Sequence, residues 1–503
     1  PTQVVDAERL ESQGALLLSD ALKQMAGVEL KDYGGVGGLK TVSARGLGSQ
    51  FSTVTVDGVA VSDAQNGQVD LGRYLVGNAA FVSFSQGQQQ QLLLPARVYA
   101  AGNVLEIESA EPRFFLAERT NLRVGMELGS YGLMNPTALW EQKWSRKLKS
   151  SLWASWLKSQ GDYPFTLYYT ASRADSSSRE TRLHSASAML TADGALFYTP
   201  GQGQTLTVKL HYMRGRHQLP GPVHLYLQRP SAESTREEVA FAQARWRMER
   251  KLWKVQAIGK WQSTFDCYED SNAATFSRHL RNDYRQSEAY ASGSAVWSPT
   301  GWLDVSAAAD GSLGSLHSNL RQRNNVHRRS AAGVAALRLH NRHLEGRVHL
   351  LGTAIADHAP DLDTTPRYRR LSPYAGLTYT FGNGRTTLRY FYKETYRAPN
   401  FSELYYMTLP RDLRPECARQ HNVGLTYAGD HASATLDAYH NRVSDKILAI
   451  PTQNMFLWSM QNLGRATIMG VDATARGTLG LGRSTLTAEC HYTYQHAVDR
   501  TDQ

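Results

Sequence analysis

The side chains that most often carry out catalysis are scattered along this 503-residue sequence. Its 16 histidines form no His-Glu-x-x-His pair, and no Gly-x-Ser-x-Gly motif presents a nucleophilic serine. The three cysteines, Cys267, Cys417 and Cys490, lie far apart and lack the close spacing of metal ligands. We therefore expect no catalytic residue, no metal site and no cofactor, and interpret the protein as a non-enzyme.

A glycine-rich run at Gly34–Gly38 raises the question of phosphate binding. A nucleotide-binding loop would continue with Gly-Lys and then Ser or Thr, and this run does not. The glycines are better explained as turn residues that accept a positive φ. The net charge of +10 does not indicate nucleic acid either, because the basic residues are spread along the chain instead of forming one stripe. We expect no nucleic-acid partner.

Hydropathy and aromatic content bear on membrane insertion. No stretch approaches the roughly 18 consecutive apolar residues that a membrane-spanning helix needs. Strands of a transmembrane barrel also leave no hydropathy peak, because lipid-facing and lumen-facing residues alternate. The 25 Tyr and 10 Trp fit a barrel, since both side chains suit a membrane–water interface.

The chain divides into two regions with different patterns. Residues 1–113 read as a compact α+β unit, in which Leu10, Leu16 and Leu22 share one face of a helix predicted over Asp6–Met25. Glycine-rich turns then separate four short strand-like runs: Lys40–Ala44, Thr53–Val56, Phe81–Ser85 and Val104–Glu108.

From about residue 118 the sequence changes to long alternating strands. In Thr205–Met213, apolar side chains alternate with Thr207, Lys209 and His211. About 17 such strands follow one another with no helix between them, which predicts an all-β closed or sandwiched sheet.

The connections between these strands indicate which kind of sheet forms. We expect a strict alternation of tight turns, such as Thr199–Gly203 and Ser298–Gly301, with long polar links, such as Gly215–Arg236 and Arg397–Gln420. Short turns at one rim and long loops at the other are typical of a transmembrane barrel with a periplasmic and an extracellular end. The sequence therefore predicts an all-β transmembrane barrel over residues 118–503.

The end of the sequence bears on the completeness of this barrel. Single-chain barrels of this kind normally have an even number of strands, and the count here is odd. The last strand, Ser484–Val498, runs outward and is followed by five polar residues. We expect further closing strands beyond Gln503.

Several motifs resemble those of TonB-dependent outer-membrane transporters, and the resemblance covers essentially the whole chain in family order. The runs that carry it are Leu22–Val28, Ser43–Gly46, Val56–Val59, Tyr396–Tyr405, Leu413–Glu416 and Asn462–Val471. It implies that residues 1–113 form a plug domain that fills a barrel of 22 antiparallel strands, about 17 of which lie in this chain.

The resemblance also implies a function and partners. Such a protein is a multi-pass protein of a Gram-negative outer membrane, and it actively imports a large, scarce nutrient with energy from TonB. The box that TonB binds is expected to lie outside this sequence. Plug arginines pair with barrel glutamates in the family, so Arg45 and Glu416 are expected to pair. A small-molecule nutrient, outer-membrane lipid and lipopolysaccharide are expected partners, and a surface lipoprotein is a further candidate.

The barrel segment Arg397–Gln503 is most similar to the cobalamin transporters, particularly over Tyr439–Ile447. This similarity favours cobalamin or another corrinoid, with a ferric siderophore or other iron complex as the alternative and carbohydrate also open. Haem transporters are less similar, because residues 400–414 contain no histidine. An enzyme barrel is disfavoured by the missing catalytic motifs, and a passive porin by the plug.

By the same alignment, ligand contacts fall on two outward plug loops, 47–51 and 65–68, and on barrel loops. Amide side chains suit a large polar ligand, because each offers both a donor and an acceptor. The alternative is that these are ordinary turn residues. The expected binding residues are Gln50, Phe51, Gln65, Asn66, Gln68, Tyr405 and Trp458. Two aromatic groups could cover a ligand or form a girdle at the outer rim: Tyr163, Phe165, Tyr168 and Tyr169, and Phe456, Leu457 and Trp458.

Overall fold

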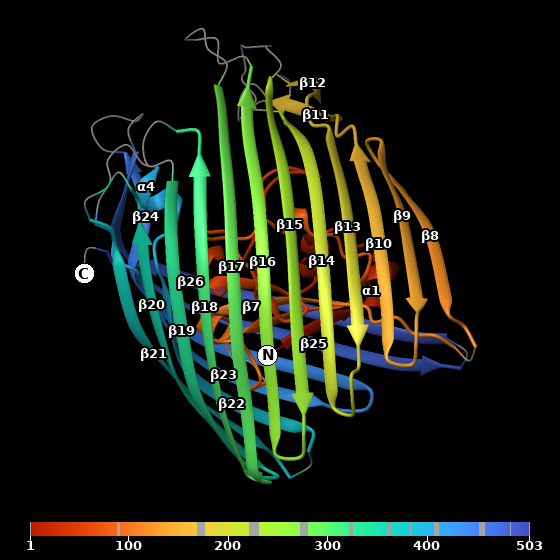
Figure 1. The fold of residues 1–503 in the computed structure, drawn as a ribbon, viewed down its shortest axis with the longest axis vertical. Helices are drawn as coiled ribbons and strands as arrows, with labels where there is room; N and C mark the ends of the chain where they lie inside the picture. Colours follow the sequence, from red (N-terminus) through yellow and green to blue (C-terminus); the bar gives the residue numbers. More distant parts are fainter. Residues whose placement is uncertain are drawn as a thin grey trace.

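An antiparallel sheet of 17 strands curls round a smaller α+β domain (Figure 1). Among the residues that the structure describes, no helix is long and apolar enough to cross a membrane. The structure is a computed structural model that describes residues 2–87, 91–115, 117–168, 177–220, 231–271, 280–320, 325–360, 362, 364–382, 384–406, 412–451, 458–482 and 484–501.

The inner domain is a plug built on a 5-stranded sheet in the order β1-β6-β7-β4-β5. Phe84 and Leu105 of this sheet pack with helix residues into an apolar core that no water reaches. All four predicted strand-like runs are strands. The plug strands are β1 (Thr2–Asp6), β2 (Val28–Asp32), β3 (Lys40–Ala44), β4 (Ser52–Val56), β5 (Val59–Val61), β6 (Ala79–Gln86) and β7 (Asn103–Ser109), with β2 and β3 paired as a separate hairpin.

The single helix predicted over Asp6–Met25 is wrong. Two helices replace it, α1 (Ala7–Ser12) and α2 (Leu18–Leu22), and Gly14 between them has a φ of +60°. Leu10 and Leu22 are nonetheless buried in the same core. The periodicity therefore predicted which side chains are buried, but it did not predict that the helix is interrupted at Gly14. The remaining short helices of the plug are η1 (Ser49–Phe51), η2 (Leu71–Arg73) and α3 (Ala96–Ala100).

The outer sheet has the predicted number of strands, 17, and each strand is antiparallel to the next in chain order. A separate two-stranded sheet, β11 (Tyr163–Tyr168) with β12 (Ser177–Arg182), lies at the extracellular rim (Figure 1). The barrel strands are β8 (Thr120–Gly129), β9 (Leu133–Lys143), β10 (Leu148–Ser159), β13 (Ser187–Tyr198), β14 (Gln204–Leu219), β15 (Glu233–Glu249), β16 (Trp253–Asp270), β17 (Leu280–Thr300), β18 (Leu303–Ser318), β19 (Asn325–His340), β20 (Leu344–His358), β21 (Arg367–Thr380), β22 (Thr386–Arg397), β23 (Glu416–Ala428), β24 (Ala432–Pro451), β25 (Trp458–Leu481) and β26 (Ser484–Asp499).

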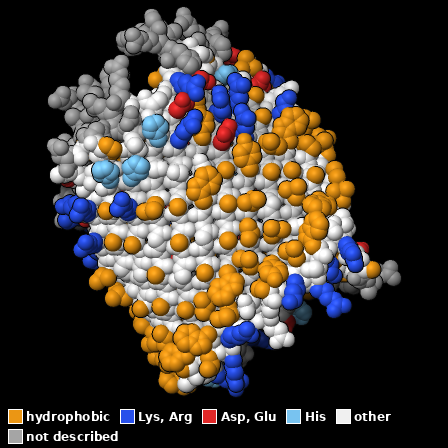
Figure 2. All heavy atoms as spheres, viewed as in Figure 1, with side chains coloured by type: hydrophobic (Ala, Val, Ile, Leu, Met, Phe, Trp, Pro, Cys, Tyr) orange, Lys and Arg blue, Asp and Glu red, His pale blue; other side chains and the backbone are white. Residues whose placement is uncertain are grey.

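The two-residue alternation sorts side chains between lipid and lumen. In β14, Leu210 and Tyr212 are exposed on the outer wall, whereas Lys209, His211 and Met213 are buried against the interior. Rows of apolar side chains cover the outer wall as a result (Figure 2). This pattern is the one that a lipid-embedded barrel requires.

Short and long links between strands are segregated to opposite rims less strictly than predicted. The first outward link, between β8 and β9, spans only residues 130–132. The predicted loop Gly215–Arg236 is also shorter, because β14 continues to Leu219 and β15 begins at Glu233. With 21 residues, β17 extends for roughly 70 Å, far more than the apolar band of about 25 Å requires. Strands, as well as loops, therefore form the wall above the plug.

Candidate ligand-binding site

The two plug loops expected to contact a ligand lie side by side and bind each other. Gln50 Nε2 donates to the Asn66 carbonyl oxygen at 3.3 Å, and Ser49 Oγ donates to Gln68 Oε1 at 2.5 Å. The structure thus brings Gln50, Asn66 and Gln68 together on the outward side of the plug.

Asp63 gives the second loop its shape. Its Oδ1 accepts the backbone N–H groups of Gln65 and Asn66, both at 3.0 Å. Gln286 of β17 donates to the same Asp63 oxygen at 3.1 Å and accepts the Ala64 N–H at 3.0 Å. The loop is therefore anchored directly to the barrel wall.

A short helix from the barrel, α4 (Phe401–Tyr405), docks on the same loop. Asn400 Nδ2 donates to the Asn66 carbonyl at 2.9 Å, and the Ser402 N–H donates to the Gln65 carbonyl at 2.9 Å. Gln65 is only 8% exposed, whereas the Asn66 side chain is exposed. Gln65 thus belongs to the contact between plug and barrel, and Asn66 remains accessible to a ligand.

Arg397 holds α4 in this position. Its Nη1 lies 2.8 Å from Glu403 Oε2, and its Nη2 lies 2.6 Å from Glu416 Oε1. Glu403 also accepts the N–H of Asn400 at 2.8 Å, which completes a capping box at the start of the helix. All four side chains are buried. The run Tyr396–Tyr405 therefore works as a structural unit that positions α4.

Tyr405 belongs to a buried ionic cluster behind the helix. Its hydroxyl donates to Asp357 Oδ2 at 2.8 Å, and Arg328 binds both oxygens of Asp357, at 2.7 and 2.8 Å. The Arg328 guanidinium also lies 4.7 Å from the ring centroid of Phe401. Because the Tyr405 side chain is only 5% exposed, it stabilises the buried side of α4.

A polar cavity of about 310 Å³ lies between the plug loops and the barrel wall. Both signs of charge and several amides line it. Arg97 Nη1 and Gln262 Oε1 are buried without a hydrogen-bond partner among the described residues. Because both atoms are buried, a ligand reaches this donor and this acceptor only when the neighbouring side chains move. The lining includes Gln50, Asp63, Arg97, Gln262, Glu288 and Arg328.

Arg97 ties the plug to the barrel at this cavity. Its Nη2 donates to Glu288 Oε1 at 2.6 Å, and its backbone N–H donates to Asp310 Oδ2 at 2.7 Å. The guanidinium lies 4.5 Å from the ring centroid of Tyr290. A ligand that engaged Arg97 would thus touch a plug–barrel contact directly.

Arg45 and Glu416, expected to pair with each other, do not meet. Arg45 Nε lies 2.9 Å from Asp472 Oδ2, and its Nη2 lies 3.9 Å from Asp437 Oδ1, whereas Glu416 is engaged by Arg397. The physical reason is the register between β24 and β25. It places Asp437 and Asp472 opposite each other on the lumen side, where Arg45, with a φ of +52°, meets the barrel.

Asp437 and Asp472 were missed by the sequence reasoning. Both occupy lumen-facing positions of alternating strands, so the alternation itself could have identified them. Like charges directly opposite each other destabilise a sheet unless a cation compensates them. Arg45 supplies one such cation from the plug, and Arg389 of β22 supplies another, with its Nη2 3.4 Å from Asp437 Oδ1.

Other charged contacts anchor the plug around its circumference. Arg73 Nε lies 2.9 Å from Glu237 Oε2, and Lys209 Nζ lies 3.2 Å from Asp57 Oδ2. Burial raises the pKa of Asp70 to about 6, although the neighbouring Arg73 acts in the opposite direction. At neutral pH Asp70 is therefore ionised, and on acidification through about pH 6 it gains a proton.

The remaining predicted residues have other surroundings. Phe51 is buried in a cluster with Leu47 and Tyr439, so it contributes to packing between plug and barrel. Trp458 begins β25, but its side chain lies outside the described part of the structure, as do Tyr169, Phe456 and Leu457. The aromatics Tyr163, Phe165 and Tyr168 lie on β11, outside the barrel sheet, and not in its wall.

The fold and this site define an outer-membrane barrel whose lumen is filled by a plug with a polar cavity beside its outward loops. Residues 1–92 match the TonB-dependent Receptor Plug Domain, and residues 333–503 match the family described as TonB dependent receptor-like, beta-barrel. The chain belongs to the TonB-dependent receptors. Membership implies coupling to TonB and transport of a small-molecule ligand across the outer membrane.

Among the solved structures of similar fold are transporters named for copper, iron and ferric yersiniabactin. The copper transporter OprC is 15% identical, with a TM-score of 0.78, over 98% of this chain and 79% of that one. The FrpB iron transporter from Neisseria meningitidis (F3-3 variant) is 11% identical, with a TM-score of 0.80, over 99% and 80%. The ferric yersiniabactin uptake receptor FyuA from Yersinia pestis is 14% identical, with a TM-score of 0.73, over 100% and 79%. None of these three is named as a cobalamin transporter, and at these identities the likeness shows the fold alone.

Proposed function

We propose that this receptor imports a metal chelate too large for a porin, with cobalamin or another corrinoid as the leading candidate. The supporting observation is the polar cavity beside the plug, where the amides Gln50 and Gln262 meet charged groups of both signs. A corrinoid carries several peripheral amides, which can pair with such groups in both directions. The cavity of about 310 Å³ would receive one edge of the ligand, and the strand walls above would surround the rest.

The proposed mechanism involves no chemistry on the ligand. Binding displaces water from the cavity and engages the outward plug loops, which are bonded to α4 and to β17. The outer membrane has neither nucleotide nor a useful ion gradient, so energy must come from the inner membrane through TonB. A pull on the plug then opens it locally, which requires breaking polar contacts such as Arg97–Glu288 before any strand of the barrel moves.

A ferric siderophore is the second candidate. It is favoured by Arg97 in the cavity lining, because many ferric chelates are anionic and a guanidinium binds anionic oxygens strongly. The uptake receptor for ferric yersiniabactin, which shares this fold, agrees with that chemistry.

Calorimetry of the detergent-solubilised protein with cyanocobalamin, a ferric siderophore and haem separates these candidates. We expect heat of binding with cyanocobalamin. Binding of the siderophore alone would transfer the assignment to the second candidate, and binding of haem alone or of no ligand would contradict the proposal.

The transport step needs its own measurement. Uptake of the bound chelate should disappear in cells that lack TonB, while binding to the same cells should persist. Equal uptake with and without TonB would show that the plug is not opened by this partner.

A further inference from the structure

Glu288 of β17 joins two separate parts of the plug in the lining of the ligand cavity. Its Oε1 accepts a hydrogen bond from Arg97 Nη2 at 2.6 Å, and its Oε2 accepts one from the Ser62 hydroxyl. Arg97 belongs to α3, and Ser62 lies just before the outward loop 65–68. A single barrel carboxylate therefore holds both α3 and the ligand loop.

The contact between Arg97 and Glu288 is incomplete as an arginine–carboxylate pair. A guanidinium binds a carboxylate or a phosphate most strongly through two parallel N–H···O bonds. Glu288 receives only one bond from Arg97, because Ser62 engages its second oxygen. Arg97 Nη1 is buried and has no hydrogen-bond partner among the described residues. Arg97 thus retains a donor for a second anionic oxygen.

The surroundings fix the guanidinium in place without using that donor. Nη2 also donates to Ser312 Oγ at 2.9 Å, and the guanidinium carbon lies 4.5 Å from the ring centroid of Tyr290. Asp310 is a second carboxylate beside Arg97, but its Oδ2 accepts the Arg97 backbone N–H at 2.7 Å and the Tyr290 hydroxyl at 2.8 Å. The Arg97 side chain is 24% exposed, so the group is held in position at the cavity.

The other arginines of the cavity lining are held more firmly. Arg328 binds both oxygens of Asp357, and Arg397 contacts two separate glutamates. Arg97, in contrast, is held by one oxygen of Glu288. An anion that enters the cavity should therefore displace the partner of Arg97 more easily than the partners of Arg328 or Arg397.

We propose that Glu288 is a built-in competitor for the anionic group of the ligand, and that a ligand carboxylate or phosphate displaces it from Arg97. The ligand anion uses both Nη atoms of Arg97, whereas Glu288 keeps its contact with Ser62. The exchange removes one tie between α3 and β17, so ligand binding loosens the plug at this point. This inference rests on the proposed function, and it restricts the imported chelate to one that carries negatively charged oxygens.

Both candidate chelates can supply such a group. The phosphodiester of cyanocobalamin and the carboxylates of many ferric siderophores each present two oxygens to one guanidinium. Dicyanocobinamide keeps the corrin amides but lacks the phosphodiester. A ligand of that kind should leave Arg97 on Glu288.

The main test measures the affinity of the detergent-solubilised protein for citrate, a small tricarboxylate, by calorimetry. Glu288→Gln removes the competing charge and keeps the side-chain shape, so it should bind citrate on the order of tenfold more tightly than the parent. A purely structural role of Glu288 would not produce such a gain. Adding Arg97→Gln should abolish it. No gain in Glu288→Gln, or a gain that persists without Arg97, would overturn the proposal.

Glu237 of β15 provides a matched control. It also lies 2.9 Å from a plug arginine, Arg73, but it does not line the ligand cavity. Glu237→Gln changes the net charge of the protein by the same amount as Glu288→Gln and should leave the affinity for citrate unchanged. An equal gain in both variants would mean that citrate responds only to the total charge, which would contradict a specific role of Glu288.

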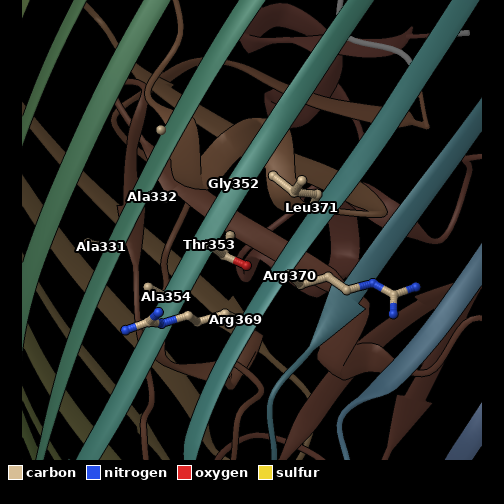
Figure 3. Close-up of a pocket in the computed structure, with 9 residues that line it drawn as sticks. Ala331, Ala332, Gly352, Thr353, Ala354, Arg369, Arg370 and Leu371 are labelled. Atoms are coloured by element: carbon tan, nitrogen blue, oxygen red, sulfur yellow. The ribbon is translucent and has the colours of Figure 1, made fainter.

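Binding of citrate to the outer wall needs a separate control. Arg369 lies across β20 beside Ala354, at the edge of a groove of about 430 Å³ that Leu371 also lines (Figure 3). Adding Arg369→Gln to Glu288→Gln should leave the gain intact. Loss of the gain in this double variant would place citrate on the outer wall and overturn the proposal.

Hydrogen exchange and the two corrinoids test the consequences for transport. Saturating citrate should speed exchange of the amides of Ala96–Ala100 in the parent, and unchanged exchange would contradict ligand-driven loosening. Glu288→Gln should bind cyanocobalamin more tightly than the parent does, with no gain for dicyanocobinamide. Equal gains for the two corrinoids would contradict selection of an anionic group. If neither corrinoid binds, the corrinoid assignment fails, and the citrate result still decides the role of Glu288.

Discussion

The inner and outer walls of the barrel differ in how their charged side chains are compensated. Inside, Asp472 is neutralised by Arg45 of the plug, and Asp437 lies between Arg45 and Arg389 of the barrel wall. Arg45, Asp437 and Asp472 are nearly inaccessible to water. Outside, Arg329 and Arg369 are exposed and have no carboxylate partner among the described residues. An unpaired charge in the lumen would lose its hydration without compensation, whereas one at the head-group level retains water or binds lipid. Inside, the plug supplies part of the compensating charge, whereas outside hydration takes its place.

The largest effect should follow from removing Arg45. Arg45→Ala leaves Asp472 at 5% exposure without the guanidinium that now lies 2.9 Å away, whereas Asp437 keeps Arg389 at 3.4 Å. The loss of a buried partner costs about 3 to 5 kcal/mol. Hydrogen exchange of the amides of Lys40–Ala44 should become faster, because this strand leads directly into Arg45.

A compensating variant distinguishes charge from packing. Adding Asp472→Asn to Arg45→Ala should restore most of the protection, because Asp437 still pairs with Arg389. If the Arg45→Ala protein exchanged no faster than the parent, the inner ionic contact would not be holding the plug.

A smaller but still large effect is expected at Arg397, which bridges Glu403 and Glu416. Arg397→Lys keeps the charge, but a single ammonium cannot reproduce two forked contacts to separate carboxylates. We expect a loss of about 2 to 3 kcal/mol of local stability, measured as faster exchange in Phe401–Tyr405. Arg385→Lys, at an exposed pair with Asp430, is the matched control and should leave this exchange unchanged.

Much of this architecture could be predicted from the alternation of side chains, because a strand that faces lipid on one side and the lumen on the other imposes a two-residue period. The break at Gly14 could not, since a positive φ leaves the periodicity of Leu10 and Leu22 intact. The partners of Arg45 depend on the register between β24 and β25, which no local motif encodes.

The proximity of the two plug loops was predictable, but the surroundings of each of their residues were not. Gln65 and Asn66 are neighbouring amides, and nothing in their types separates them. Their difference arises because α4, more than 300 residues later, docks on the backbone of the loop and buries Gln65 alone. Tyr405 was also predicted to contact the ligand. In the structure its hydroxyl donates to Asp357 behind α4.

This difference between two adjacent amides can be sharpened by experiment. Asn66→Ala should weaken binding of the chelate by about 1 to 3 kcal/mol, if its partner on the ligand is left buried and unpaired, and should leave plug protection unchanged. Gln65→Ala keeps the backbone hydrogen bonds of the loop but removes a buried side chain, so it should alter the protection of the loop more than the intrinsic affinity. Calorimetry and hydrogen exchange on the same two proteins provide both readouts. Equal effects of the two variants on both measurements would remove the distinction.

The smallest effect is expected at Arg9 and Glu489, a plug–barrel ion pair with side chains 29% and 24% exposed. Solvent screens this pair, and Arg476 lies 3.3 Å from the same carboxylate, so Arg9→Ala does not leave Glu489 without a cation. A double-mutant cycle of Arg9→Ala and Glu489→Gln should give a coupling of about 0.2 to 1 kcal/mol. The coupling should diminish further at about 1 M salt, where the screening length falls to about 3 Å. A coupling as large as that of Arg45 with its aspartates, and insensitive to salt, would mean that burial does not determine which plug contacts matter.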